Sequence, residues 1–276
     1  MRHINFIILL LVFLFLGKIS LTQAVLPLNS FDSSWQAALG TEFNKNYFKE
    51  LDKALTEARK TKLIYPSEEQ TFTAFKLTPL SQLKVVIIGQ DPYPGEETDD
   101  NGNLQPLGHG LAFSVRPEIK QIPKSLYNIF VKLNQELGLA IPEQGNLNKW
   151  ATQGVLLMNA TLTLDASLPP AKRPNSHKSF PSNRANWRIF TDAVIDRIAA
   201  SKKNVVFILW GSFAQNKERI ISKYLINNHL VIKGAHPSPM PSSLRLFMDP
   251  SAQFFKPTNE FLIKTNQKPI NWDLTK

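Results

Sequence analysis

The stretch of sequence that decides the fold is Lys84-Val-Val-Ile-Ile-Gly-Gln-Asp-Pro-Tyr-Pro94. Its first half is a short apolar run rich in β-branched residues, which is typical of a strand buried on both faces of a parallel sheet. Its second half starts at Gly89 and contains two prolines, which end the strand and stiffen the loop that follows. The stretch therefore holds an amide, a carboxylate and a phenol just beyond a strand end, where open parallel sheets bind their ligands. Taken alone, it is equally compatible with an ordinary strand-to-turn junction carrying a solvated Asp91.

Three more apolar runs predict strands of the same kind, at residues 154–160, 204–210 and 229–233. Apolar residues at helical spacing predict helices before and between these strands, over 31–62, 125–137, 187–200 and 212–226. Ser125 and Ser212 stand at the expected N-caps of two of these helices. Strands that alternate with helices predict an α/β fold with a central four-stranded parallel sheet flanked by helices. No repeat or internal linker interrupts the pattern, so we expect one domain over residues 27–276.

The composition favours a polyanionic partner. The chain has 32 Lys and Arg against 22 Asp and Glu, a net charge of +10, which favours nucleic acid or an anionic membrane as the partner. Cysteine is absent, which excludes disulfides, zinc–thiolate sites, iron–sulfur clusters and cysteine nucleophiles.

The N-terminus needs a separate interpretation. Arg2 precedes an unbroken apolar run, Phe6 to Leu16, that is too short to span a bilayer comfortably but has the length of a signal-peptide core. Thr22-Gln-Ala24 would serve as a small-residue cleavage site. A start codon assigned too far upstream is the other explanation. In either case residues 1–24 are excluded from the predicted fold.

Polar residues gather at the predicted strand ends, which lie along one edge of a parallel sheet. These residues are Gln90, Asp91, Tyr93, Asn159, Ser212, His236 and Ser238. Each of these residues is a weak signal alone. That all of them stand at corresponding strand ends is much harder to explain by chance. No glycine-rich phosphate loop of the Walker or Rossmann type is present, which argues against nucleotide-cofactor enzymes. No serine lies in a G-x-S-x-G elbow, which argues against a serine hydrolase of that type.

Six motifs make the sequence resemble the family 1 uracil-DNA glycosylases, and they occur in that family's order. They are Gly89-Gln-Asp-Pro-Tyr93, Gly110-Leu-Ala-Phe-Ser-Val115, Gly154-Val-Leu-Leu-Met-Asn-Ala160, Asn175-Ser-His-Lys178, Trp210-Gly-Ser212 and His236-Pro-Ser-Pro239. Lys268-Pro-Ile-Asn-Trp272 resembles the family's C-terminal tail. The resemblance implies a three-layer α/β sandwich.

The implied reaction is hydrolysis of the N-glycosidic bond of uracil in DNA. This reaction releases uracil and leaves an abasic site, the first step of base excision repair. The alternative is a DNA-binding protein on the same fold with weak or no glycosylase activity.

By this resemblance, the catalytic residues are Asp91 and His236. The carboxylate of Asp91 orients the attacking water and stabilises the cation-like sugar. The imidazole of His236 donates a hydrogen bond to uracil O2 as negative charge develops there. Four residues are expected to bind the base: Gln90, Tyr93, Phe113 and Asn159. The amide of Asn159 offers a donor and an acceptor side by side, which matches uracil O4 and N3–H.

The resemblance also implies a set of DNA contacts. Ser125, Ser212 and Ser238 are expected to contact phosphates, and Met240 stands where the family usually has a leucine wedge. The implied partner is uracil-containing DNA, single- or double-stranded, bound by a monomer that needs no metal or organic cofactor. The implied location is the cytoplasm, together with the DNA, or outside it if the leader acts as a signal or a membrane tether.

Four departures from the family pattern point to altered DNA affinity or rate. Pro94 stands where most members have His, and Asp165 stands where the family often has Arg. The loop after Pro94 is longer than usual, and we expect its exposed acids to repel phosphate if it lies close to DNA; they are Glu96, Glu97, Asp99 and Asp100. An insertion with Pro169, Pro170 and Pro174 precedes the Asn175 motif.

Overall fold

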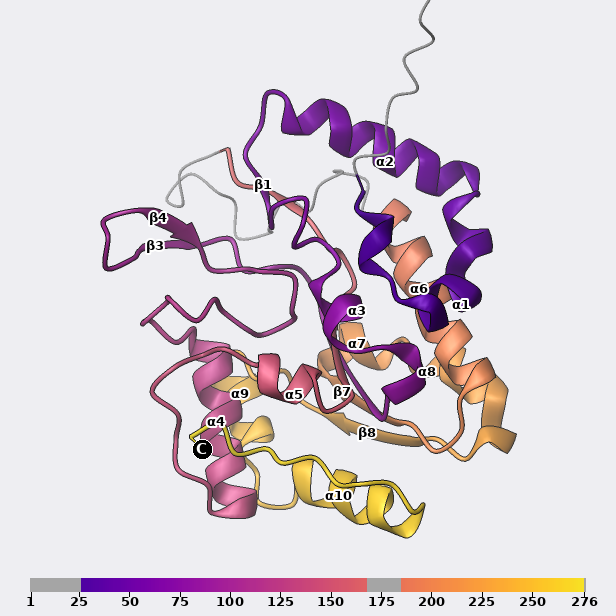
Figure 1. Cartoon of the computed structure of the whole chain (residues 1–276). Helices are drawn as coiled ribbons and strands as arrows, with labels where there is room; N and C mark the ends of the chain where they lie inside the picture. The colour runs from indigo at the N-terminus through magenta and orange to yellow at the C-terminus, as the bar shows by residue number, and fades with distance from the viewer. Residues whose placement is uncertain (1–25, 168–184, 276) are drawn as a thin grey trace, which may run out of the picture.

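The computed structural model describes residues 26–167 and 185–275 (Figure 1). Its centre is a four-stranded sheet of β2 (Val85–Gly89), β5 (Val155–Asn159), β7 (Val206–Trp210) and β8 (Leu230–Gly234). The strands are parallel and lie in the order β5-β2-β7-β8. The predicted four-stranded parallel sheet is therefore confirmed. Its four strands all end at one edge, and the register pairs Gly89 with Asn159 and Trp210 with Gly234 there.

Burial explains why these runs form this sheet. Every residue of β2, β5 and β7 is buried, as near-continuous apolar runs require when helices cover both faces of a sheet. Strand β8, at one edge of the sheet, is only half-buried, whereas β5 at the other edge is fully covered. The long helices α1 (Ser33–Phe43), α2 (Asn46–Arg59) and α6 (Ala185–Ser201) group on one side of the sheet in Figure 1. On the other side lie α4 (Lys124–Leu137), α9 (Pro241–Phe247) and α10 (Phe255–Lys264).

Shorter elements connect these layers. They are η1 (Leu28–Ser30), β1 (Ile64–Tyr65), α3 (Thr73–Leu77), η2 (Leu80–Gln82), β3 (Glu96–Thr98), β4 (Leu104–Pro106), α5 (Asn148–Ala151), β6 (Leu164–Asp165), α7 (Gly211–Gln215), α8 (Glu218–Ile221) and η4 (Ser222–Asn227). Strands β1 and β6 pair antiparallel, and so do β3 and β4. The sequence did not predict these two small sheets, because runs of two or three residues are too short to show a period.

Aromatic packing fixes the N-terminal helices against α6. Asp32 accepts a hydrogen bond from the backbone N–H of Trp35 at 2.9 Å and so caps α1. The buried indole of Trp35 donates to the carbonyl of Thr78 at 2.8 Å. Phe31 is 1% exposed, and its ring centroid lies 4.7 Å from that of Phe72. Edge and tilted contacts of this kind add to the free energy gained by burying the rings.

Two predicted helix caps are wrong. Helix α4 begins at Lys124, after Pro123 with its φ near −58°, so Ser125 is inside the first turn and makes no cap. Helix α7 begins directly at the end of β7, so no loop residue precedes it and Ser212 does not cap it. The helix predicted over 212–226 is broken into α7, α8 and η4, with non-helical backbone angles at Tyr224. No helix among the described residues is long and apolar enough to cross a membrane.

The predicted leader, residues 1–24, and the proline-bearing insertion at 169–174 lie outside the described residues, as does the Asn175-Ser-His-Lys178 motif.

A buried histidine links the segment after β4 to the core. His109 is 4% exposed, and its Nε2 lies 2.8 Å from the hydroxyl oxygen of Ser114. The same hydroxyl oxygen accepts the backbone N–H of Leu147 at 2.9 Å. Burial, with a smaller contribution from the positive charge of Arg116, lowers the pKa of His109 from 6.5 to about 4. The ring is therefore neutral in the folded protein near pH 7.

We expect His109 to make the fold sensitive to acid. As the pH falls from 6.5 to about 4, the unfolded chain binds a proton at this residue and the folded chain does not. The free energy of unfolding should therefore fall in this window, by about 3 kcal/mol at most from His109 alone. Urea denaturation across pH 4–7.5 should show a smaller fall for His109→Gln than for the wild type. Equal falls in the two proteins would mean that His109 does not carry the effect.

Candidate active site

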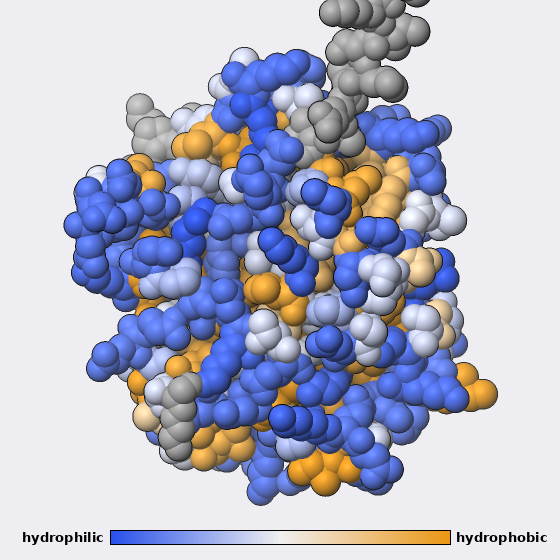
Figure 2. All heavy atoms as spheres, in the orientation of Figure 1, coloured by the Kyte–Doolittle hydropathy of each residue, from blue (hydrophilic) through white to orange (hydrophobic). Residues whose placement is uncertain are grey.

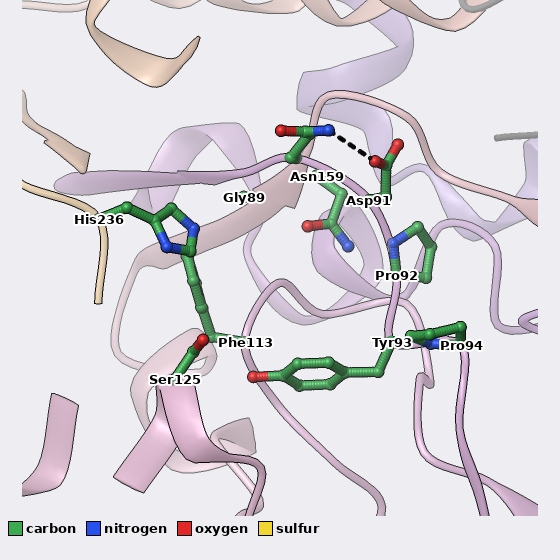
Figure 3. A pocket seen from close by; sticks show the side chains of 10 residues that line it. Gly89, Asp91, Pro92, Tyr93, Pro94, Phe113, Ser125, Asn159 and His236 are labelled. Atoms are coloured by element: carbon green, nitrogen blue, oxygen red, sulfur yellow. Dashed lines mark hydrogen bonds between the residues drawn. The ribbon is translucent and has the colours of Figure 1, made fainter. Parts of the chain in front are cut away.

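The ends of the central strands meet at a cavity of about 300 Å³ (Figure 3). Its lining residues are Gly89, Gln90, Asp91, Pro92, Tyr93, Pro94, Phe113, Ser125, Asn159 and His236. The structure thus brings together both predicted catalytic residues, all four predicted base-binding residues and one of the predicted phosphate contacts. These residues come from β2, β5, α4 and the loops after β2, β4 and β8, so only the folded chain assembles them.

The inner end of the cavity depends on a close approach of β2 and β5. Gly89 pairs with Asn159, and a Cβ added at Gly89 would lie 2.2 Å from Asn159 Oδ1. Asn159 is only 5% exposed. The ladder continues past the strands, with Ala160 N–H donating to the Gly89 carbonyl at 2.9 Å and Thr161 N–H to the Gln90 carbonyl at 3.0 Å. The sequence analysis gave Gly89 no part in the site beyond ending the strand. A glycine at the end of a β-branched run is nevertheless a sign that another chain segment approaches closely there.

The loop after β2 places a carboxylate at the cavity. Asp91 is half-buried, and its Oδ2 accepts a hydrogen bond from the Gln90 side-chain amide at 3.0 Å, drawn as the dashed line in Figure 3. Pro92 is buried directly behind it. A carboxylate that keeps part of its surface open to the cavity can accept a hydrogen bond from water or stabilise a nearby positive charge.

The loop after β8 places an imidazole at the cavity. His236 is half-buried, and burial lowers the pKa of its ring below 6.5, so the ring is neutral near pH 7. The ring of Phe113 lies 6.1 Å from it and 5.6 Å from the buried ring of Trp210. Phe113 has a φ of 63°, an uncommon conformation for a residue with a side chain. Such strain is held by the surrounding structure and is typical of functional sites.

Tyr93 lies across the cavity with its hydroxyl group directed toward Ser125 (Figure 3). The hydroxyl oxygen is buried and forms no hydrogen bond within the described part of the chain. Burial raises the pKa of this phenol above its usual value of 10, so it stays neutral. The ring lies between the loop of Asp91 and Ser125 of α4 and so narrows the cavity.

Three predicted DNA contacts do not line the cavity. Ser212 is exposed in the first turn of α7, and Ser238 is half-buried two residues after His236. Met240 is 63% exposed immediately before α9. No DNA is bound to this structure, so their contacts remain predictions. An exposed apolar residue near the cavity has the geometry that a wedge needs.

The long acidic loop is a hairpin tied into the protein by its own acids. Strands β3 and β4 pair, and Figure 2 shows this hairpin as a hydrophilic projection. Glu97 accepts the backbone N–H groups of Lys120 at 3.2 Å and Gln121 at 3.0 Å, and Asp100 pairs with the Lys120 ammonium group. Asp99 accepts two N–H groups of the turn, and Glu96 accepts the hydroxyl of Tyr65. Residues 100–104 are exposed, as expected of this acidic stretch, but the stretch forms a paired hairpin whose carboxylates have partners within the protein.

The other departures have simple positions. Pro94 lines the cavity next to the start of the hairpin. Asp165 of β6 forms an ion pair at 2.9 Å with Lys62, in the turn between α2 and β1. Within the described ranges no group of three or more His, Asp or Glu side chains is placed to hold a metal ion.

Comparison with known proteins gives a consistent result. Residues 75–263 match the family model "Uracil DNA glycosylase superfamily". The chain is 42% identical over 241 residues to uracil-DNA glycosylase 2 of Streptomyces coelicolor, covering 87% of this chain and 94% of that one. It is 41% identical to the uracil-DNA glycosylase of Deinococcus radiodurans, covering 91% of both chains. The crystal structure of mimivirus uracil-DNA glycosylase superposes with a TM-score of 0.73 at 27% identity, covering 89% of this chain and 88% of that one.

Gly89→Ala tests the close approach at the inner end of the cavity. The added methyl group would collide with the buried Asn159 amide, so one of the two must shift. We expect the unfolding free energy to fall by about 1–3 kcal/mol, as in other overpacked cores, and the Asn159 side-chain NMR signals to shift.

Gly40→Ala is the matched control, because no atom lies within 4 Å of a Cβ at that position in α1. This change should be neutral or stabilise the protein by about 0.5–1 kcal/mol. Equal stability of the two variants would contradict the crowding at Gly89.

Proposed function

The chain belongs to the uracil-DNA glycosylase superfamily and hydrolyses the N-glycosidic bond of uracil in DNA, and we propose that Asp91 and His236 carry the chemistry. The reaction releases uracil and leaves an abasic site, which starts base excision repair. The observation that supports the two residue roles is the shared cavity, in which a carboxylate and a neutral imidazole face the side chain of Asn159. None of the reported comparisons favours a DNA-binding protein without activity.

Asp91 acts on the sugar and on the water. The bond between uracil N1 and deoxyribose C1′ breaks with its electron pair going to the base, and a water oxygen bonds to C1′. The carboxylate of Asp91 stabilises the cation-like sugar through its negative charge. One of its oxygens accepts a hydrogen bond from the attacking water. The hydrogen bond from Gln90 helps to fix the orientation of the carboxylate beside the reacting atoms.

His236 acts on the leaving base. As the N1–C1′ bond breaks, negative charge spreads to uracil O2, and an N–H of the imidazole donates a hydrogen bond to that oxygen. The lowered pKa keeps the ring neutral near pH 7, and one nitrogen of a neutral imidazole carries the N–H that donates this hydrogen bond. Removing such a donor typically costs about 10²–10³-fold in rate.

The base is recognised by three side chains. The Asn159 amide pairs with O4 and N3–H of uracil and mismatches the reversed pattern of cytosine. The Tyr93 ring occupies the space that a methyl group on C5 of thymine would need. Phe113 stacks on the flipped base, and Gln90 contacts the base at the cavity rim.

DNA is held around this cavity by a basic protein of net charge +10. We place phosphate contacts at Ser125, Ser212 and Ser238, and a wedge that fills the emptied stack at Met240. Both single- and double-stranded DNA fit this scheme.

The chemistry assigned to Asp91 and His236 needs no metal ion, and a single copy of the chain supplies all the lining residues, so we propose a metal-independent monomer. We place it in the cytoplasm with the DNA, and N-terminal sequencing of the native protein would show whether the leader is kept.

Asp91→Asn should lower turnover by about 10²-fold or more, because an amide cannot stabilise the cationic sugar as a carboxylate does. Binding of uracil-containing DNA should stay within a few-fold of the wild type. The assay is incubation with a uracil-containing oligonucleotide followed by alkali, which cleaves at abasic sites. Wild-type turnover in this variant would remove Asp91 from the mechanism, and no cleavage by the wild-type protein at any concentration would overturn the proposed function.

Asn159→Asp should weaken the discrimination between uracil and cytosine. A protonated carboxyl group donates to N3 of cytosine and accepts from its amino group, which reverses the pattern that the amide presents. The ratio of kcat/KM for uracil over cytosine, measured on matched oligonucleotides, should fall, with the cytosine activity rising from background. If the ratio is unchanged, Asn159 does not read the base.

A further inference from the structure

Helix α4 carries a row of polar side chains along one face. Ser125, Asn128, Lys132 and Glu136 are spaced by three or four residues, the spacing of neighbours on a helix surface. Ser125 lines the cavity. Asn128 is 9% exposed and Lys132 is 1% exposed, so this face is inside the protein. Polar groups are costly to bury unless each has a hydrogen-bond partner.

Each buried member of the row bonds to the backbone of one segment, residues 237–256. Asn128 Nδ2 donates to the carbonyl of Pro237 at 2.9 Å. Lys132 Nζ donates to the carbonyl of Asp249 at 2.7 Å. Glu136 accepts the N–H groups of Phe254, Phe255 and Lys256 at 2.8–3.2 Å. Helix α4 therefore binds this segment at three places, through Asn128, Lys132 and Glu136.

The bond from Asn128 is the one next to the active site. Pro237 directly follows His236 in the chain. Its carbonyl belongs to the peptide unit between Pro237 and Ser238, next to the residue that carries the imidazole. The segment then continues through Ser238 to Met240. In the sequence, Asn128 reads only as a polar residue within a helix, and nothing there points to a loop 109 residues away.

We propose that Asn128 is a positioning residue that holds His236 against the leaving base through the Pro237 carbonyl. The inference rests on the role of His236 given under Proposed function. One rigid helix thereby carries both the serine that lines the cavity and the anchor of the histidine loop. A displacement of about 1 Å at a catalytic group can cost up to 10²-fold in rate, so one hydrogen bond at this place has a large effect on turnover.

The test is Asn128→Leu, which keeps a similar size and removes the donor. We expect kcat to fall about 10-fold or more with KM changed less than about 3-fold, and the NMR signals of the His236 ring to shift. Gln135→Ala is the matched control, since Gln135 is an exposed amide on the same helix, and it should leave kcat and the ring signals as in the wild type.

A double-mutant cycle separates positioning from general destabilisation. His236→Asn alone should lower kcat about 10²–10³-fold, and adding Asn128→Leu to it should lower kcat less than about 2-fold further. An equal factor in both backgrounds, or wild-type kcat in Asn128→Leu, would overturn the inference. Wild-type kcat in His236→Asn would instead overturn the role of His236 itself. If Asn128→Leu does not fold, Asn128→Ala is measured in the same cycle with the same two criteria.

Discussion

The approach of β2 to β5 at Gly89 and Asn159 is the constraint on which the rest of the site depends. The parallel register places these residues opposite each other, and the missing side chain at Gly89 makes the room that the Asn159 amide occupies. Parallel pairing needs the fully apolar runs of β2, β5 and β7 and helices on both faces. Those runs also end together, so the loops after them deliver a carboxylate and an imidazole to the same cavity as the amide.

Burial sets the charge state of the site. It lowers the pKa of His236, which keeps the ring neutral near pH 7, and raises the pKa of Tyr93, whose phenol is neutral there in any case. Asp91 is only half-buried and is held by the Gln90 amide. In the proposed mechanism, the carboxylate faces the developing cation and the neutral imidazole donates to the developing anion. Fixed groups of this kind stabilise charge more effectively than water does, because they need not reorient as the reaction proceeds.

The sequence predicted the sheet and most of the cavity, because strand ends are marked by apolar runs that stop at Gly, Asn or His. It failed where tertiary contacts decide. Ser125 looked like a cap, but Pro123 lets the helix start one residue earlier. The acids after Pro94 were expected to be exposed, and Asp100 is, but the sequence could not show that Glu97 accepts N–H groups of Lys120 and Gln121, more than 20 residues away. Gly89 and Asn128 matter through partners distant in sequence, and no local pattern reports such a partner.

The hairpin and α4 together explain how this basic protein tolerates an acidic insertion beside its substrate. Glu97 binds backbone N–H groups and Asp100 binds Lys120, so the segment that leads into α4 is held by these two acids. Their negative charge is directed toward protein donors, which reduces its repulsion of phosphate. This segment leads into α4, and α4 in turn binds the loop of His236 through Asn128. The acidic hairpin thus adds hydrogen bonds to the segment that leads into α4, the helix whose Asn128 binds the loop of His236.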